Sequence, residues 1–394
     1  MAVACALLGG VTALGVGKLA GWTDSSSTTT VFRAAPFDQS TGTAAAAAVG
    51  SAAKPLAGNG FSPRSIYANR SPGVVTIVSV FGSDAETGRR QQGSGFVVSP
   101  EGYVLTNSHV ITDAGESGSR ARPADSVFVE FQDRDRAKAT IVGWDVFDDV
   151  GLLKVDPTAH TLSPVPLGNS ATVAVGEPVA AIGSPFGNEN SLAVGVVSAT
   201  RRSIESLTSE FDLVDAIQTD APINHGNSGG PLFDARGRVI GINAQIRSTT
   251  GQAEGVGFAV PINSAKRSMQ QLIADGSVSY AFVGVVTADL TPALARHFGY
   301  AVFRGAVVTD VVSGGPADEA GLRAGSSTGT AFGIEFPRNG DVIVAIDGHP
   351  VTGKEDIARI VTNLSPGKRT RFTVERGHSR LQLSVRLGRR SDAD

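Results

Sequence analysis

Short apolar runs separated by turn residues fill the chain from Ser71 to about residue 260. Glycine, proline, asparagine and aspartate occupy the gaps between these runs. Many short strands at this spacing are typical of an all-β barrel or sandwich and disfavour an alternating α/β fold. The runs expected to form strands are 74–81, 96–98, 103–106, 127–131, 139–144, 151–155, 179–182, 192–197, 216–219, 239–243 and 257–260.

The pattern changes to a helical period at 263–274, with the sequence NSAKRSMQQLIA. Met269, Leu272 and Ile273 fall on one face of a helix drawn through this segment. Gly276 follows as a helix stop. The segment therefore predicts a helix that ends the first folded unit.

A second folded unit begins near Tyr280. Its pattern predicts five or so strands and two helices, which make a small α+β or partly open barrel domain. The expected strands are 282–286, 306–312, 341–346, 371–375 and 381–387, and the expected helices are 316–320 and 354–364.

The N-terminal part of the chain differs from the rest. Residues 1–22 are almost entirely apolar, which is typical of a signal peptide or a membrane anchor. A buried helix of the folded domain is the alternative, and Cys5 lies too early in the apolar run to favour lipid attachment. Residues 23–62 are rich in serine, threonine and alanine and carry few charges, so we expect a low-complexity linker.

Composition excludes several classes of protein. The chain has 34 Lys+Arg against 37 Asp+Glu, a net charge of −3, so it is not a strongly basic nucleic-acid binder. Cys5 is the single cysteine. An intrachain disulfide framework and a zinc site built from several cysteines are therefore excluded.

A glycine-rich turn presents a serine at 224–232, with the sequence NHGNSGGPL. The flanking glycines would expose Ser228 on a turn whose backbone amides are unencumbered, as a nucleophile requires. The amides of Gly226 and Ser228 can then point at one developing oxyanion. The same sequence also suits an ordinary turn, in which His225 is an exposed loop side chain.

A histidine and an aspartate stand at the ends of predicted strands. His109 lies in an apolar stretch at a strand end, where its orientation would be controlled. Asp149 immediately precedes an apolar strand and could hold an imidazole in one tautomer. Asp145 and Asp148 compete with it for that role. The order His109, Asp149, Ser228 is that of the chymotrypsin-like double barrel.

These motifs resemble those of the HtrA-type (DegP/DegS-like) serine proteases. The segments that carry the resemblance are GSGFVVSPEGYVLTNSHVI (93–111), DDVGLLKV (148–155), GVVSATRR (195–202), QTDAPINHGNSGGPL (218–232) and GRVIGIN (237–243). The resemblance implies a mainly β chain, with a chymotrypsin-like double β-barrel at 63–277 followed by a PDZ domain at 278–390.

The second unit resembles a PDZ domain in the segment Phe282, Val283, Gly284 and Val285, which looks like its carboxylate-binding loop. Residues 326–339 lie where many PDZ domains run directly from one motif to the next, so we expect a loop insertion there.

The resemblance also implies a reaction and its partners. Ser228 would be the nucleophile, His109 the general base and then acid, and Asp149 the residue that orients it. Gly226 and Ser228 would form the oxyanion hole, and no metal or cofactor is expected. The expected substrates are unfolded or damaged exported proteins, and C-terminal peptides are the expected PDZ ligands, with no nucleic acid. Similar proteins suggest a homotrimer or a multiple of it, located outside the cytoplasm and either membrane-anchored or secreted.

The specificity pocket is expected on the strand after the nucleophile, at Asn243, Ala244 and Gln245. Asp220 is expected to be structural and not a pocket floor. A pocket without a floor carboxylate favours small or medium apolar side chains over lysine and arginine.

A second class of function stays open on the sequence. The chain could be an exported PDZ scaffold or holdase that keeps a protease-shaped domain without catalysis. The complete set of His109, Asp149 and Ser228 favours the enzyme.

Overall fold

The computed structural model describes residues 60–82, 89–114, 121–184, 190–209, 211–223, 226–244 and 256–390. The chain divides into two units, Met1–Ala57 and Gly58–Asp394, and all that follows concerns the second. The segment 1–22 and nearly all of the expected linker lie outside the described residues. No helix within the described ranges is long and apolar enough to cross a membrane.

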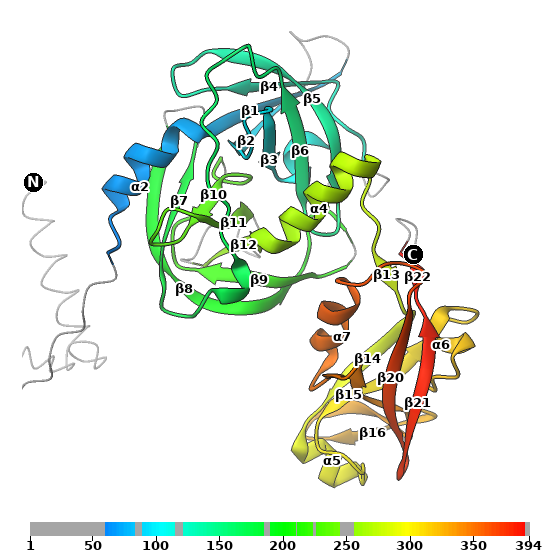
Figure 1. Ribbon diagram of the computed structural model, residues 1–394. Helices are drawn as coiled ribbons and strands as arrows, with labels where there is room; N and C mark the ends of the chain where they lie inside the picture. The colour runs from blue at the N-terminus through cyan, green and yellow to red at the C-terminus, as the bar shows by residue number, and fades with distance from the viewer. Residues whose placement is uncertain are drawn as a thin grey trace, which may run out of the picture. The chain divides into compact units, whose positions relative to one another are not determined.

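The first six strands close into a barrel in the order β1-β2-β3-β6-β5-β4 (Figure 1). Its interior is filled by valine, isoleucine and leucine side chains that alternate along the strands. The strands are β1 (Val74–Phe81), β2 (Arg89–Val97), β3 (Tyr103–Thr106), β4 (Ser126–Glu130), β5 (Arg136–Asp145) and β6 (Val150–Val155).

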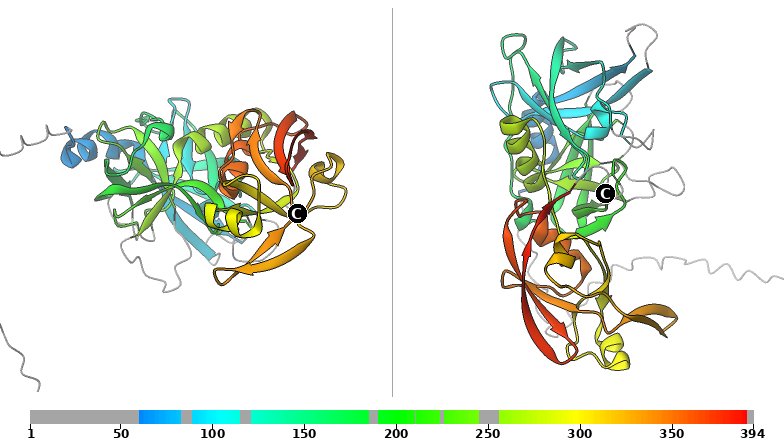
Figure 2. Two further views of the ribbon diagram at one scale, coloured as in Figure 1. Left: turned by 90° about the horizontal axis from the view of Figure 1, so that it is seen from below. Right: turned by 90° about the vertical axis from the view of Figure 1, so that its right-hand side faces the viewer.

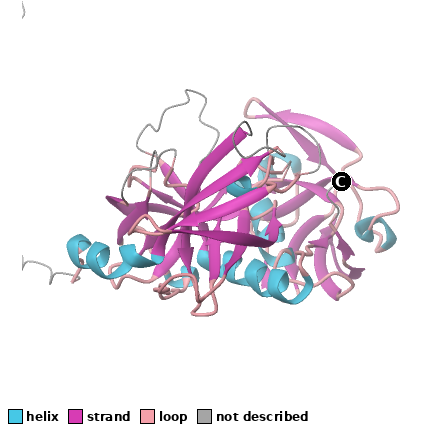
Figure 3. Ribbon diagram, turned by 90° about the horizontal axis from the view of Figure 1, so that it is seen from above, coloured by secondary structure: helices cyan, strands magenta, loops and turns pink. Residues whose placement is uncertain are grey.

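The next six strands close into a second barrel in the order β10-β11-β12-β9-β8-β7. Phe96 and Leu105 of the first barrel share one core with Ile182 and Phe233 of the second, so the two barrels pack against each other. The strands are β7 (Pro178–Gly183), β8 (Ser191–Ile204), β9 (Leu213–Thr219), β10 (Pro231–Phe233), β11 (Val239–Ala244) and β12 (Gly257–Pro261). The predicted double β-barrel is confirmed, and strands predominate in Figure 3.

Helices are few in this part of the chain. The predicted helix at 263–274 is present as α4 (Ile262–Asp275) and ends at Gly276, whose φ is +68°. A further helix, α2 (Pro63–Arg70), precedes the first barrel and is capped by the Ser62 hydroxyl. Only Ile66 of α2 is buried, so the sequence has no repeating apolar pattern from which this helix could be predicted. The short helices are α3 (Ser108–Ile111), η1 (Ser71–Gly73) and η2 (Ser170–Thr172).

The C-terminal part forms a PDZ-type sheet in the order β14-β15-β18-β20-β21, flanked by helices (Figures 1 and 2). Because β14 pairs only with β15 in this sheet, it is an edge strand. The sheet strands are β14 (Val285–Leu290), β15 (Gly305–Val311), β18 (Val342–Ile346), β20 (Arg369–Arg376) and β21 (Ser379–Arg386). The remaining elements are β13 (Ala281–Phe282), β19 (His349–Pro350), β22 (Gly388–Arg389), α5 (Pro292–Phe298), α6 (Pro316–Glu319) and α7 (Lys354–Val361).

Three sequence expectations differ from the structure in this domain. Helices were expected only at 316–320 and 354–364, and α5 is a third. The single strand expected at 282–286 is interrupted, because Gly284 has a φ of +76° and separates β13 from β14. The loop expected at 326–339 is a hairpin of β16 (Ser327–Ala331) and β17 (Ile334–Arg338). Its turn residues Phe332 and Gly333 both have positive φ, which is the two-residue turn that suits a hairpin.

Candidate active site

The pairing of β3 with β6 brings His109 and Asp149 together. His109 lies in α3 directly after β3, and Asp149 directly precedes β6. Thr106 and Gly151 are partners in the antiparallel ladder, so the residues just beyond them are neighbours. The Nδ1 atom of His109 lies 2.8 Å from Oδ2 of Asp149. Of the three aspartates considered from sequence, it is Asp149 whose carboxylate contacts the imidazole.

Both oxygens of the Asp149 carboxylate are used. The Ser108 hydroxyl and the His109 amide donate to Oδ1 at 2.8 and 3.1 Å, while Oδ2 contacts the ring. The Asn107 side chain donates to the Asp149 carbonyl at 2.8 Å. Ser108 and Asn107 stand directly before His109 in the sequence. Their bonds to Asp149 could not be predicted, because Asp149 is remote in the chain. Asp149 has a φ of +48°, a strained conformation for a residue other than glycine.

The environment of His109 favours its charged form. Burial of the ring lowers its pKa, but the charge of Asp149 and the hydrogen bond of the ring to its carboxylate act in the opposite direction and prevail. The pKa of His109 is therefore raised above its ordinary value of 6.5. An imidazole with this partner can take a proton from a neighbouring hydroxyl and hold it.

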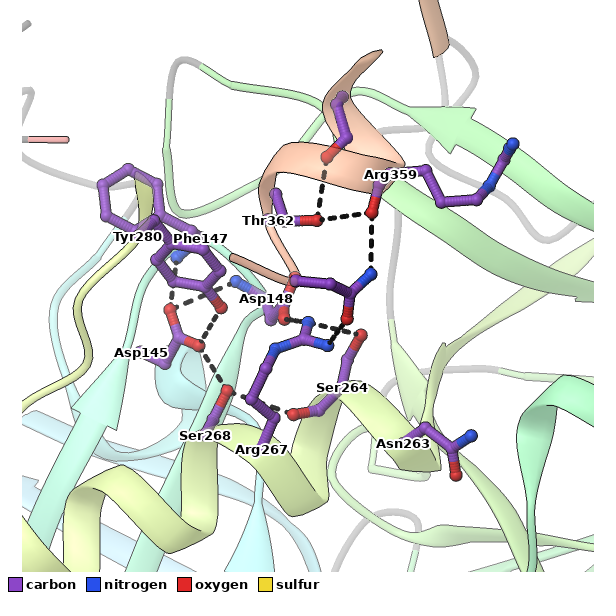
Figure 4. A network of polar contacts seen from close by, with 12 residues as sticks. Asp145, Phe147, Asp148, Asn263, Ser264, Arg267, Ser268, Tyr280, Arg359 and Thr362 are labelled. Carbon is purple, nitrogen blue, oxygen red and sulfur yellow. Dashed lines mark hydrogen bonds and ion pairs between the residues drawn. The ribbon is translucent and has the colours of Figure 1, made fainter. Parts of the chain in front are cut away.

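Asp145 and Asp148 have other partners (Figure 4). Asp145 accepts the amides of Phe147 and Asp148 on Oδ1, and the hydroxyls of Ser268 and Tyr280 on Oδ2, both at 2.6 Å. These donors come from the turn itself, from α4 and from the segment between α4 and β13. Asp145 therefore fixes the turn that ends at Asp149 without touching the histidine.

This network continues into the PDZ-type domain. The Arg267 guanidinium binds Asp148 at 3.2 Å and donates to Asn363, just beyond α7, at 2.6 Å. Arg390 stacks over the Phe211 ring at 4.2 Å and lies near the Tyr280 ring. These contacts have no local signal in the sequence, because they join residues 96 or more positions apart.

Ser228 lies on the second barrel and faces the first. The turn that carries it has positive φ at Gly226 and Gly229, +98° and +85°. A Cβ on Gly229 would lie 2.1 Å from the Ser94 carbonyl oxygen and 3.2 Å from the Asn107 amide. The turn therefore packs directly against the segment that leads to His109, and only glycine fits there.

The Ser228 side chain is 4% exposed. Within the part of the chain that the structure describes, its Oγ has no hydrogen-bond partner, and its amide donates to no protein acceptor. A buried hydroxyl and a buried amide at one turn are what an acyl-transfer site requires. Asn224 and His225, the residues just before this turn, lie outside the described residues.

The expected pocket residues Asn243 and Ala244 are buried on β11. The Asn243 backbone binds the Ser228 turn, since its carbonyl accepts the Gly229 amide at 2.9 Å and its amide donates to the Gly230 carbonyl at 2.8 Å. Its side chain donates to Pro231 at 3.2 Å. Gln245 lies outside the described residues. Asp220 accepts the Val196 amide at 2.7 Å, a contact within the barrel wall.

The segment expected to bind a carboxylate is a turn between β13 and β14. The carbonyls of Val283 and Gly284 accept the amides of Ala317 and Val312. The amides of Val283 and Gly284 donate to no acceptor among the described residues. Two free amides beside an edge strand suit an anionic chain end.

We predict that the His109 titration depends on Asp149 alone among the neighbouring carboxylates. Replacing Asp149 with asparagine removes the charge that offsets burial, so the pKa of His109 should fall. NMR titration of the imidazole carbons measures this. Asp148→Asn is the matched control and should leave the titration nearly unchanged; equal shifts in both variants would contradict the pairing.

A second prediction concerns Asp145. Burial, followed by the charge of Asp148, raises its pKa from 3.8 to about 6 against the hydrogen bonds from Ser268 and Tyr280. The folded state therefore holds this proton more tightly than the unfolded state. Stability should fall as pH rises from 3.8 through about 6, relative to an Asp145→Asn variant that has no proton to lose. Urea unfolding followed by Trp144 fluorescence measures the difference.

The control for this experiment is Asp113 in the same barrel. Burial raises its pKa, but hydrogen bonds and charge from Arg122 prevail and lower it. The wild type should therefore gain stability relative to Asp113→Asn as pH rises toward the ordinary value of 3.8, the opposite sign. The same sign for both aspartates would contradict the assignment.

Comparisons with known proteins agree with this geometry. Residues 93–242 match the trypsin-like peptidase domain family, and residues 281–387 match the PDZ domain family. A probable periplasmic serine endoprotease, DegP-like, of Ectopseudomonas mendocina is 40% identical over 296 residues, 75% of this chain and 56% of the relative. Its counterpart from Hahella chejuensis is 39% identical with the same coverage. The chain thus spans little more than half the length of these curated relatives.

Solved structures extend the likeness to both domains. The HtrA-type protease AlgW with a tripeptide has a TM-score of 0.68 and 34% identity, and the match covers 84% of this chain and 98% of that one. The serine endoprotease from Yersinia pestis has a TM-score of 0.59 and 28% identity, with the same coverage. The chain therefore belongs to the family of HtrA-type serine proteases with a PDZ domain.

Proposed function

We propose that this protein is a serine endopeptidase that hydrolyses peptide bonds through an acyl-enzyme. The observation that carries the proposal is the Asp149–His109 pair at 2.8 Å, beside a turn on which the buried Ser228 hydroxyl has no hydrogen-bond partner among the described residues. Ser228 attacks the scissile carbonyl, and His109 takes its proton and later gives it to the leaving amine. Asp149 holds the ring in one tautomer and stabilises the imidazolium.

The amides of Gly226 and Ser228 are proposed as the oxyanion hole. Their positions on a turn with positive φ at Gly226 and Gly229 support this role. We also propose that Asn243, Ala244 and Gln245 border the pocket for the residue before the cleaved bond. With Asp220 held by the barrel wall, the expected preference is for small or medium apolar side chains.

The PDZ domain is proposed to bind C-terminal peptides. The edge strand β14 can accept an added peptide strand, and the free amides of Val283 and Gly284 can bind the terminal carboxylate. We propose domain limits of 63–277 and 278–390 for the two parts. Tyr280 falls within the second of these ranges, but its hydroxyl binds Asp145 in the first.

The expected substrates are unfolded or damaged exported proteins. The relatives named above are described as periplasmic, which supports a location outside the cytoplasm for this chain. A membrane tether or signal peptide at 1–22 and a homotrimer or a multiple of it complete the proposal as expectations. A scaffold or holdase without catalysis is the competing function, and the next experiment separates the two.

We predict that Ser228→Ala lowers kcat for a peptide or an unfolded protein by at least about 10⁴-fold. The loss arises because no acyl-enzyme can form, while the fold and the binding of C-terminal peptides should persist. A fluorophosphonate should label Ser228 in the wild type and nothing in the variant. Turnover within a factor of a few of the wild type, or an unlabelled wild-type Ser228, would favour the scaffold.

We further predict that a peptide with a free C-terminal carboxylate binds the PDZ domain, and that its amidated form binds at least about tenfold more weakly. Gly284→Ala should weaken binding, since φ is +76° there and a Cβ would lie 3.2 Å from both Phe282 and Val312. Gly348→Ala is the control, because φ is +85° there but nothing lies within 4 Å. Fluorescence anisotropy of a labelled peptide measures both, and equal affinities would contradict the assignment.

A further inference from the structure

Ser94 binds the nucleophile turn from the opposite barrel. It lies in β2 between Gly93 and Gly95 and is 0% exposed. Its amide donates to the Ser228 carbonyl at 2.8 Å. Its hydroxyl donates to the Gly226 carbonyl at 2.5 Å. One residue of the first barrel thus holds the carbonyls on both sides of Asn227.

The direction of the hydroxyl bond is fixed. A serine hydroxyl has one proton to donate and can accept in addition. The Ser184 amide donates to Ser94 Oγ at 2.9 Å, which uses the acceptor side. The single proton of Ser94 is therefore directed to Gly226.

The position of Ser94 is itself determined by the strand that leads to the histidine. The Thr106 hydroxyl donates to the Ser94 carbonyl at 2.7 Å. Gly229 packs on the same carbonyl so closely that its Cβ position would lie 2.1 Å away. Ser94 therefore has a fixed place relative to both the His109 segment and the turn.

The residues that Ser94 holds are the two whose amides form the proposed oxyanion hole. Gly226 has a φ of +98° and no Cβ, so rotation of its peptide groups costs little unless a partner prevents it. Catalysis by an oxyanion hole requires that both amides point at one atom before the reaction begins. A bond that fixes the Gly226 carbonyl limits the orientations open to that residue.

We propose that Ser94 is a positioning residue for the oxyanion hole, acting through its hydroxyl on Gly226 and through its amide on Ser228. The proposal rests on the endopeptidase function proposed above. Ser94 touches no substrate; it keeps the Gly226 and Ser228 amides directed at the oxygen that becomes negative in the transition state. The motif that contains it, GSG at 93–95, can be seen in the sequence. That it binds Gly226 and Ser228 cannot.

The test is Ser94→Ala in the full chain. This variant removes the hydroxyl and retains the backbone bond to Ser228. We expect kcat for a peptide substrate to fall by about 10- to 100-fold with KM changed less than about threefold, because oxyanion contacts form in the transition state. A peptide aldehyde, whose adduct places an oxyanion in the hole, should lose affinity by a similar factor. The matched peptide alcohol, which forms no adduct, should not.

Thr219→Val is the matched control. The Thr219 hydroxyl is also buried, donates to a carbonyl, that of Val196, at 2.8 Å and accepts an amide, that of Ala221, at 3.1 Å. Its loss should lower the urea midpoint of unfolding as Ser94→Ala does, with kcat unchanged. Ser94→Cys, which fills the space and keeps a weak donor, should have a kcat between those of the wild type and Ser94→Ala.

The outcomes separate this proposal from the proposed function. If Ser94→Ala lowers kcat no more than Thr219→Val, raises KM alone, or weakens aldehyde and alcohol equally, the positioning role is wrong. If Ser94→Ala does not fold, a Ser94→Cys variant that folds with wild-type kcat and aldehyde affinity overturns it. If the wild type neither hydrolyses peptides nor reacts with a fluorophosphonate, the endopeptidase function itself fails.

Discussion

The Asp149 carboxylate is the group on which the position of the His109 imidazole depends. It receives the imidazole, a hydroxyl and an amide on two oxygens, and its residue has a φ of +48°. Such a conformation persists only where surrounding contacts enforce it. Contacts of this kind reach Asp149 from Asn107, Ser108 and His109. Asp145 holds the turn just before it, since it binds two amides within the turn and two hydroxyls from outside.

The same turn is one of the places where the two domains are in contact. One of the hydroxyls on Asp145 belongs to Tyr280, which lies in the chain as it passes to the PDZ domain. Arg267 joins Asp148 to Asn363 at the end of α7, and Arg359 of α7 binds Asp215 of β9 at 2.6 Å. The contacts between the domains therefore reach Asp148, which is the neighbour of Asp149 in the sequence. Of these contacts the Tyr280–Asp145 bond is buried, and its groups would be costly to leave unpaired.

The fold and the candidate site residues could be predicted from the sequence for different reasons. Short apolar runs with turn residues between them are local signals, and they predicted eleven of the twelve barrel strands. The three-residue β10, directly after the Ser228 turn, was not expected. His109 and Asp149 could be identified as candidates because each stands at the end of a predicted strand. The helix α2 was missed because one buried residue, Ile66, makes no period. The hairpin at 326–339 could not be predicted, because its strands are mostly exposed and their apolar and polar residues alternate weakly.

The remaining contacts could not be predicted, because their partners are remote in sequence. Nothing near Tyr280 indicates that its hydroxyl binds a carboxylate 135 positions away. The pairing of Ser94 with Gly226 spans 132 positions and depends on how one barrel faces the other. Sequence patterns report the residue type and the local conformation, whereas these contacts are set by the packing of closed barrels.

Two glycine-rich motifs, GSG at 93–95 and NSGG at 227–230, are the two sides of one contact. A Cβ on Gly93 would lie 3.1 Å from the Ser228 carbonyl, and one on Gly229 would lie 2.1 Å from the Ser94 carbonyl. Glycine at these positions allows two backbones to approach within hydrogen-bonding distance. In the proposed mechanism the two serines have different roles, since Ser94 positions the turn and Ser228 attacks. The seam leaves no space for a side chain between the turn that carries Ser228 and the strand that carries Ser94.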